Sequence, residues 1–164
     1  MNRRLPGEPV IGGKRLSASM RLPAVGQDLY VLPGAQGERT VVLLTEGWSE
    51  EGGEWTRINL VKVSGGKAEI THTQDVAGSL ADSRLAGNRL ILATTEWDYD
   101  DGISSDGWNV KSHLSEWLLA PDQAPTAAGE TLIEGYSPLI ASGPDWLAVS
   151  VHPKGEWGVS DVSV

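Results

Sequence analysis

A tryptophan that follows a glycine-bearing turn occurs three times in this chain, and this recurrence most constrains its fold. The tryptophans stand 53 and 49 residues apart, in the turns Gly53-Glu54-Trp55, Asp106-Gly107-Trp108 and Gly155-Glu156-Trp157. Each precedes a segment in which apolar and polar residues alternate, as in a half-buried β-strand. Four-stranded units repeated every roughly 40 to 50 residues are typical of β-propeller blades. The spacing therefore predicts an all-β protein built from repeated antiparallel units.

The alternating segments define two complete units and part of a third. In the first unit we expect strands at 28–32, 40–45, 56–63 and 68–74, with a tight turn at Ser64-Gly65-Gly66-Lys67. The second unit repeats this pattern at 79–85, 89–95, 111–120 and 126–133. The third begins at Ser137, continues through 146–151 and 159–164, and lacks its last strand. No segment keeps an apolar period of about 3.6 residues over three turns, so helices are not expected.

The fold class that we predict is all-β and propeller-like, with about three four-stranded antiparallel blades at 29–74, 79–133 and 137–164. Residues 1–14 are expected to be a linker or a disordered lead-in, and residues 15–22 a lone strand. The lone strand and the last three strands together amount to one blade. Two chains would then close a six-bladed ring as a homodimer, each lone strand completing its partner's last blade. The alternative is a fragment of a longer single-chain propeller.

The charge and composition of the chain exclude several classes of function. Its formal net charge of -9 repels phosphate backbones and anionic lipid surfaces, so nucleic acid is not an expected partner. Cysteine is absent from the sequence, which excludes disulfides, thiolate catalysis and cysteine-ligated metal sites. No window approaches the ~18 apolar residues of a membrane-spanning helix, and the first residues do not form a secretion signal. We therefore expect no membrane insertion.

One stretch of the chain resembles a known family. It holds a strand ending in Ser-Arg, a Gly-Asn-Arg-Leu turn and an aliphatic strand, and it reads Ser83-Arg84-Leu85-Ala86-Gly87-Asn88-Arg89-Leu90-Ile91-Leu92-Ala93-Thr94. In this order it resembles a bacterial and archaeal family of secreted β-propeller domains, distantly related to tryptophan–aspartate repeat proteins. The resemblance covers roughly residues 28–151, and the chain has about three blades where a closed ring needs more. It implies a propeller scaffold, secreted or in the cell envelope, with an unknown ligand, and the family has no established catalytic residues to carry over to this chain.

An acidic loop is a candidate metal site. Asp98, Asp100 and Asp101 lie close together in the sequence, and carboxylate oxygens at such density are the ligands that calcium prefers. The spacing is not that of an EF-hand, so a solvated acidic turn is the alternative, and no other cofactor is expected. No Gly-x-Ser-x-Gly sequence marks a serine nucleophile. A histidine metal site is not expected either, because the three histidines occupy non-equivalent strand positions, at His72, His113 and His152.

One arginine and four tryptophans are the candidate ligand-binding residues. Arg84 lies on the first strand of a unit, the strand that lines the central channel of a propeller, so it either forms a salt bridge with Asp82 or Asp75 or contacts a ligand. The tryptophans flank two loops on what we expect to be one rim, and they are Trp48, Trp55, Trp97 and Trp108. Exposed aromatic side chains on loops provide surfaces for sugars or peptides, and packing between blades is the alternative.

These features predict a non-catalytic binding or scaffold module whose rim contacts a protein or carbohydrate ligand. The alternative function is that of a hydrolase, which would use carboxylates of the acidic loop directly or through calcium. No catalytic motif in the sequence favours the enzyme over the binding module.

Overall fold

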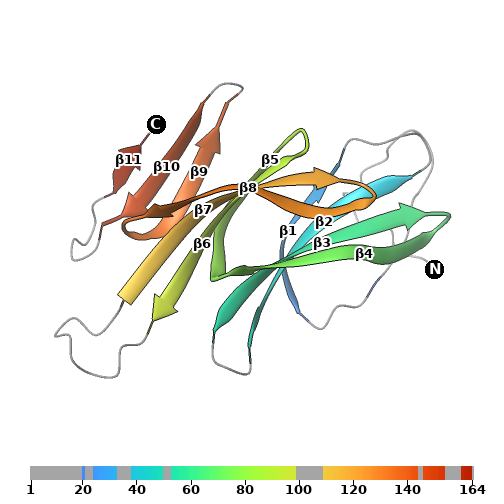
Figure 1. Ribbon diagram of the computed structural model, residues 1–164, viewed down its shortest axis with the longest axis horizontal. Coiled ribbons are helices and arrows are strands. Elements are labelled where there is room, and N and C mark those ends of the chain that lie inside the picture. The colour runs from blue at the N-terminus through green and yellow to red at the C-terminus, as the bar shows by residue number, and fades with distance from the viewer. Residues whose placement is uncertain are drawn as a thin grey trace, which may run out of the picture.

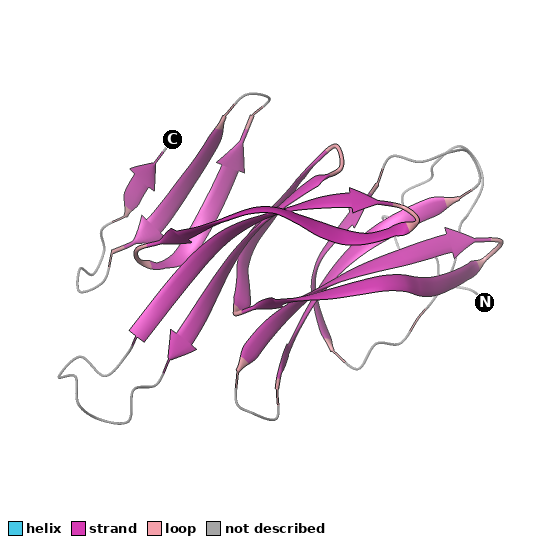
Figure 2. Ribbon diagram, in the orientation of Figure 1, coloured by secondary structure: helices cyan, strands magenta, loops and turns pink. Residues whose placement is uncertain are grey.

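Strands make up the regular structure of the described chain. The computed structural model describes residue 20 and residues 24–32, 38–49, 53–98, 109–143, 146–153 and 160–163. These residues form no helix (Figure 2), and hence none that is long and apolar enough to cross a membrane. The all-β prediction is confirmed. The strands are β1 (Val25–Val31), β2 (Arg39–Trp48), β3 (Glu54–Ser64), β4 (Lys67–Ala77), β5 (Ser79–Ala86), β6 (Arg89–Asp98), β7 (Asn109–Ala120), β8 (Gln123–Ile133), β9 (Tyr136–Ser142), β10 (Leu147–His152) and β11 (Asp161–Ser163).

The strands form three separate antiparallel sheets in which chain neighbours are also sheet neighbours. The first sheet has the order β1-β2-β3-β4, the second β5-β6-β7-β8, and the third β9-β10-β11. This confirms two four-stranded units followed by a three-stranded one. The lone strand expected at 15–22 lies outside the described residues, apart from Met20, which belongs to no strand.

Most strands of the first two sheets extend further than the sequence predicts; β4, for example, continues to Ala77, and β8 begins at Gln123. β2 continues to Trp48, which pairs with Glu54 of β3 inside the expected loop, and β6 likewise continues to Asp98. β1 begins at Val25, three residues before the expected start. The sequence does not show this start, because a β-bulge after Gly26 interrupts the alternation that marks a strand. Ladder hydrogen bonds therefore carry these strands beyond their apolar segments.

Glycines with positive φ make the tight turns within the sheets. Gly65 and Gly66 join β3 to β4 with φ angles of 58° and 79°, and Gly87 lies between β5 and β6 with a φ of 63°. Residues with a side chain rarely adopt such angles, whereas glycine does so without steric cost. The hairpin turn predicted at Ser64–Lys67 is confirmed by the pairing of these two residues.

A glycine also stands at each junction between sheets. Gly78 joins β4 to β5 with a φ of 86°, and Gly135 lies between β8 and β9 with a φ of 116°. A Cβ atom at Gly135 would lie 2.6 Å from the carbonyl oxygen of His152, and one at Gly78 would lie 2.9 Å from that of Thr95. Both junctions therefore require glycine for its backbone conformation and for its lack of a side chain.

A buried hydroxyl holds each of these junctions in place. The Thr56 hydroxyl on β3 donates to the carbonyl oxygen of Gly78 at 2.8 Å. On β7, the third strand of the second sheet, the Ser112 hydroxyl donates to the carbonyl oxygen of Gly135, also at 2.8 Å. The chain therefore passes from one sheet to the next in the same way twice.

The sheets pack face to face in chain order, as Figure 1 shows along the long axis of the molecule. The first strands β1, β5 and β9 are in contact as a row, and β9 also packs on β6 and β7. The contact between the third sheet and the second buries Pro138 and Ile140 of β9. The main core lies between the first and second sheets and contains Leu32, Val42, Leu44, Ile58, Leu60, Leu90, Leu92 and Leu119.

Candidate functional site

Two of the predicted binding tryptophans lie on one rim of neighbouring sheets. Trp48 ends β2, and Trp97 lies one residue before the end of β6; each strand is the second of its sheet. The two strands run toward the same edge of the stack (Figure 1). The two residues are 65% and 40% exposed, respectively. We call this edge, defined by Trp48 and Trp97, the tryptophan rim.

The third sheet continues this rim with two further rings. The Tyr136 ring of β9 lies with its centroid 6.3 Å from that of Trp97, and 5.5 Å from that of His152 on β10. Sequence reasoning missed Tyr136 and treated His152 as an ordinary strand residue. The available signal was a tyrosine directly after the junction glycine Gly135, but its meaning depends on how the second and third sheets pack.

Trp55, in contrast, packs on its own sheet. It pairs with Gly47 across the β2–β3 hairpin, and its ring occupies the space where a Cβ of residue 47 would lie, 2.2 Å away. The Arg57 guanidinium lies over the ring, 4.5 Å from its centroid. Arg57 also donates to both carboxylate oxygens of Asp75, at 2.5 and 2.8 Å, and so holds the pKa of that carboxyl below its usual value. These contacts give Trp55 a packing role.

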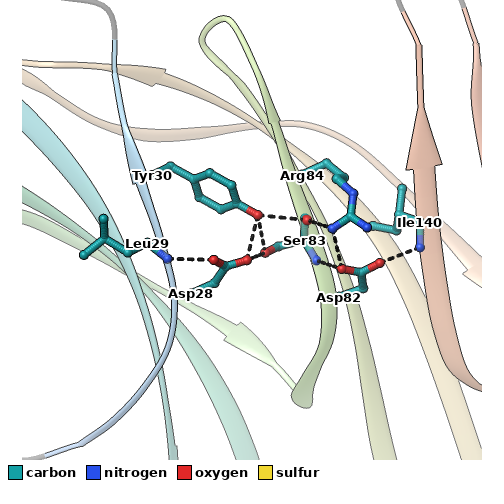
Figure 3. Close-up of polar contacts among 7 residues, drawn as sticks. All are labelled: Asp28, Leu29, Tyr30, Asp82, Ser83, Arg84 and Ile140. Atoms are coloured by element: carbon teal, nitrogen blue, oxygen red, sulfur yellow. Dashed lines mark hydrogen bonds and ion pairs between the residues drawn. The ribbon is translucent and has the colours of Figure 1, made fainter. Parts of the chain in front are cut away.

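Arg84 belongs to a polar network between the second and third sheets. Its Nη1 atom lies 2.7 Å from Asp82 Oδ1 on the same strand, so Asp82 is its ion-pair partner, while Asp75 pairs with Arg57. The other oxygen of Asp82 accepts the backbone N–H of Ile140 on β9 at 2.7 Å (Figure 3). Asp82 therefore ties the second sheet to the third, and Arg84 balances its charge.

An equivalent carboxylate, Asp28 on β1, ties the first sheet to the second (Figure 3). Its Oδ1 accepts the N–H of Leu29 at 2.8 Å, and its Oδ2 accepts the Ser83 hydroxyl at 2.6 Å. The Tyr30 hydroxyl lies 2.7 Å from the same Oδ2 and 2.8 Å from the carbonyl oxygen of Ser83. Asp28 and Asp82 each follow a bulge in the first strand of their sheet, so they hold equivalent positions.

The protonation states of this network follow from its contacts. Burial raises the pKa of Asp28, but hydrogen bonds from Ser83 and Tyr30 lower it. With the N–H of Leu29 and the charge of Arg84 they outweigh burial, so the pKa lies below its usual value. Burial also raises the pKa of Tyr30, with a further rise from the Asp28 carboxylate against a fall from Ser83. At neutral pH the network thus pairs an ionised Asp28 with a protonated Tyr30.

The remaining candidates can be placed only in part. Asp98 ends β6, whereas Asp100, Asp101 and Trp108 lie outside the described residues. Within the described ranges, no group of three or more histidine, aspartate or glutamate side chains could hold a metal ion. The histidines lie on strands of three different sheets, namely His72 on β4, His113 on β7 and His152 on β10.

The structure groups some of the candidates and separates others. Trp48 and Trp97 share a rim, Trp55 packs on its own sheet, and Arg84 belongs to a tie between sheets. Comparison of the chain with protein-family models, curated proteins and solved structures found no match. The case for a function therefore rests on the tryptophan rim and on the stacked sheets that present it.

Proposed function

We propose that this chain is a non-catalytic binding module on a β-propeller-like scaffold, with the tryptophan rim contacting a carbohydrate or protein ligand. Three antiparallel sheets follow one another in chain order, pack face to face and place their first strands in a row. Consecutive propeller blades have this arrangement, since each buries its faces only on its neighbours. The observed stacking supports the scaffold half of the proposal.

The observation that carries the binding half is the exposure of Trp48 and Trp97 at equivalent strand ends. An indole that packs within a sheet is covered, as the ring of Trp55 is by Gly47 and Arg57. Tryptophan provides a large rigid apolar surface with one hydrogen-bond donor, and it is enriched among the residues that dominate binding energies. Two such side chains on neighbouring sheets offer a ligand two contacts on one rigid rim.

The polar network supports a scaffold role for the inner strands. The two carboxylates equivalent by register, Asp28 and Asp82, both accept hydrogen bonds from the following sheet. A carboxylate that acts in hydrolysis needs access to substrate or water, whereas these two are engaged in holding sheets together. The network thus positions the rim without taking part in chemistry.

The test is a binding screen on the purified chain, followed by tryptophan substitutions. Soluble oligosaccharides and a displayed peptide library are screened, and each hit is titrated by thermal shift, since a ligand at 100 times its Kd stabilises the folded state by about 2.7 kcal/mol. We expect Trp48→Ala and Trp97→Ala each to weaken binding at least roughly tenfold, an anchor contribution of about 1.4 kcal/mol or more.

The matched control is Trp146→Ala. Trp146 is 50% exposed and directly precedes β10, at the edge of the stack opposite to the rim. Its substitution should leave the titration unchanged. Equal losses in all three variants, or no loss in the two rim variants, would contradict the rim as the contact surface. Release of reducing sugar or cleaved peptide from the bound ligand would contradict the non-catalytic assignment.

A further inference from the structure

The two end sheets each leave one face outside the stack. On the first sheet, side-chain alternation and strand register place Leu29, Val31, Val41, Leu43 and Val61 on the side away from the second sheet. We call these five residues the first outer face. On the third sheet, the same argument defines a second outer face, which carries Leu139, Ala141, Ala148, Ser150 and Val162. Val61 is 4% exposed, and the same register places the ion pair of Arg57 and Asp75 on the outer side of the first sheet as well.

Register identifies the counterparts of these residues inside the stack. In each sheet the ladder of the first strand resumes after an irregularity, at Asp28, Asp82 and Leu139 respectively. Leu139 is thus equivalent to the two carboxylates that tie the sheets together. By the same alignment, Leu29 is equivalent to Ser83, which is buried between the first and second sheets. Leu29 is 59% exposed and Leu139 is 58% exposed.

At both ends of the stack, a leucine stands where a residue of the hydrogen-bonded pair between sheets would be. In each internal contact a carboxylate accepts a hydrogen bond from the following sheet, from the Ser83 hydroxyl to Asp28 and from the Ile140 N–H to Asp82. The third sheet has Leu139 where the acceptor would be, and the first sheet has Leu29 at the position of Ser83. The N–H of Leu29 is already bonded to Asp28 within its own strand. Neither Leu29 nor Leu139 can therefore form this hydrogen bond with its side chain.

We propose that the outer face of the third sheet binds the outer face of the first sheet of a second copy of this chain, with Leu139 against Leu29. The second sheet already uses both kinds of face, one against the first sheet and one against the third. A second copy presents the complementary face at each end, and two copies related by a two-fold axis form both contacts at once. This goes beyond the ligand role of the rim and does not depend on it.

Light scattering on the purified chain gives the first test. We expect a mass of twice 17.5 kDa, and a monomer or an open-ended series of larger species would overturn the proposal. Leu139→Asp places a charge against Leu29 with no donor, in both contacts of the pair, and should weaken association on the order of a hundredfold. The control is Leu132→Asp on β8, a leucine that is 61% exposed and belongs to neither outer face, and this variant should remain paired.

Restoring the polar tie gives a sharper test. The double variant Leu29→Ser with Leu139→Asp recreates across the contact the pair that Ser83 and Asp28 form within the chain. It should associate at least roughly tenfold more tightly than Leu139→Asp alone, because the buried charge regains its donor. An affinity no better than that of the single variant would show that residues 29 and 139 do not meet.

A mixing experiment separates failure of the contact from failure to fold. Leu29→Asp damages only the first-sheet face, and Leu139→Asp damages only the third-sheet face, so each variant alone should be monomeric. Mixed one to one, they retain one contact in which both faces are intact, and light scattering should show heterodimers. Unfolded variants could not complement each other, and a mixture of folded variants that stays monomeric would overturn the head-to-tail arrangement.

Discussion

The replacement of Gly135 by alanine is the sharpest test of how the third sheet joins the second. Residue 135 has a φ of 116°, outside the left-handed region that other residues occasionally adopt. An added Cβ would lie 2.6 Å from the carbonyl oxygen of His152, and 3.1 Å from the Cβ of Val151. His152 pairs with Tyr136 in the β9–β10 ladder, so its carbonyl cannot turn aside as a flexible side chain would.

The cost of Gly135→Ala has two parts. Backbone strain at such an angle amounts to about 1–3 kcal/mol. Forcing a methyl group against β10 adds about 1–3 kcal/mol, as overpacking does in cores. We therefore expect a loss of about 2–6 kcal/mol. Gly66→Ala is the matched control, because Gly66 also has a positive φ, 79°, but no atom lies within 4 Å of its added Cβ. Strain alone should cost about 1 kcal/mol there.

Urea unfolding followed by tryptophan fluorescence measures both variants. The free energy of unfolding is extrapolated to water for each protein, and the slope reports whether the same surface unfolds. Gly135→Ala should lie at least about 1 kcal/mol below Gly66→Ala, from the overpacking and strain terms together. If the two variants agree within about 0.5 kcal/mol, the close approach of residue 135 to β10 is wrong.

Three further substitutions test the ties and the packing around Trp55. Asp28→Asn should cost about 1.5–3 kcal/mol at pH 7 by removing a charged acceptor. The folded-state pKa of Asp28 is lowered, so its contribution is present above the usual aspartate value and is lost as the pH falls through the folded-state pKa. The difference from wild type in urea titrations should therefore shrink as the pH is lowered below that usual value. Gly47→Ala sets a Cβ 2.2 Å from the Trp55 ring; it should cost about 1–3 kcal/mol and alter the near-ultraviolet circular dichroism, and an unchanged spectrum would contradict the stacking. Thr56→Val leaves the Gly78 carbonyl without its buried donor and should cost about 1–3 kcal/mol in the same urea assay, where an unchanged midpoint would show that the hydroxyl does not hold the junction.

Local sequence signals predict the sheets well because they act over few residues. The Gly65-Gly66 turn and the alternation that precedes it require only neighbouring side chains, and the strand order follows from short connections. The start of β1 at Val25 could not be seen, because the bulge after Gly26 shifts the period by one residue. β2 continues to Trp48 because its backbone forms ladder hydrogen bonds with β3. Such backbone bonds do not require particular side chains, so the sequence does not reveal them.

The candidate site is less accessible to sequence reasoning, because its contacts join distant strands. The tryptophans at 48 and 55 look alike in sequence, and only the register of the hairpin shows that the second lies over Gly47. That signal, a glycine opposite a tryptophan, becomes visible once the loop length is known. The contact of Asp28 with Ser83 spans 55 residues, and that of Asp82 with Ile140 spans 58, so neither can be found without the stacking of the sheets.

The glycine junctions also determine how a protein of this design can change its size. With Gly78 alone between β4 and β5, and residues 134 and 135 between β8 and β9, no slack exists in which an inserted residue could be absorbed. Inserted peptides should be accepted in the solvent-facing turn at Gly65 and Gly66 and rejected at the junctions. Such a chain can be lengthened or shortened by duplicating or deleting whole sheets. The spacing between sheets then stays the same, because each junction keeps its length.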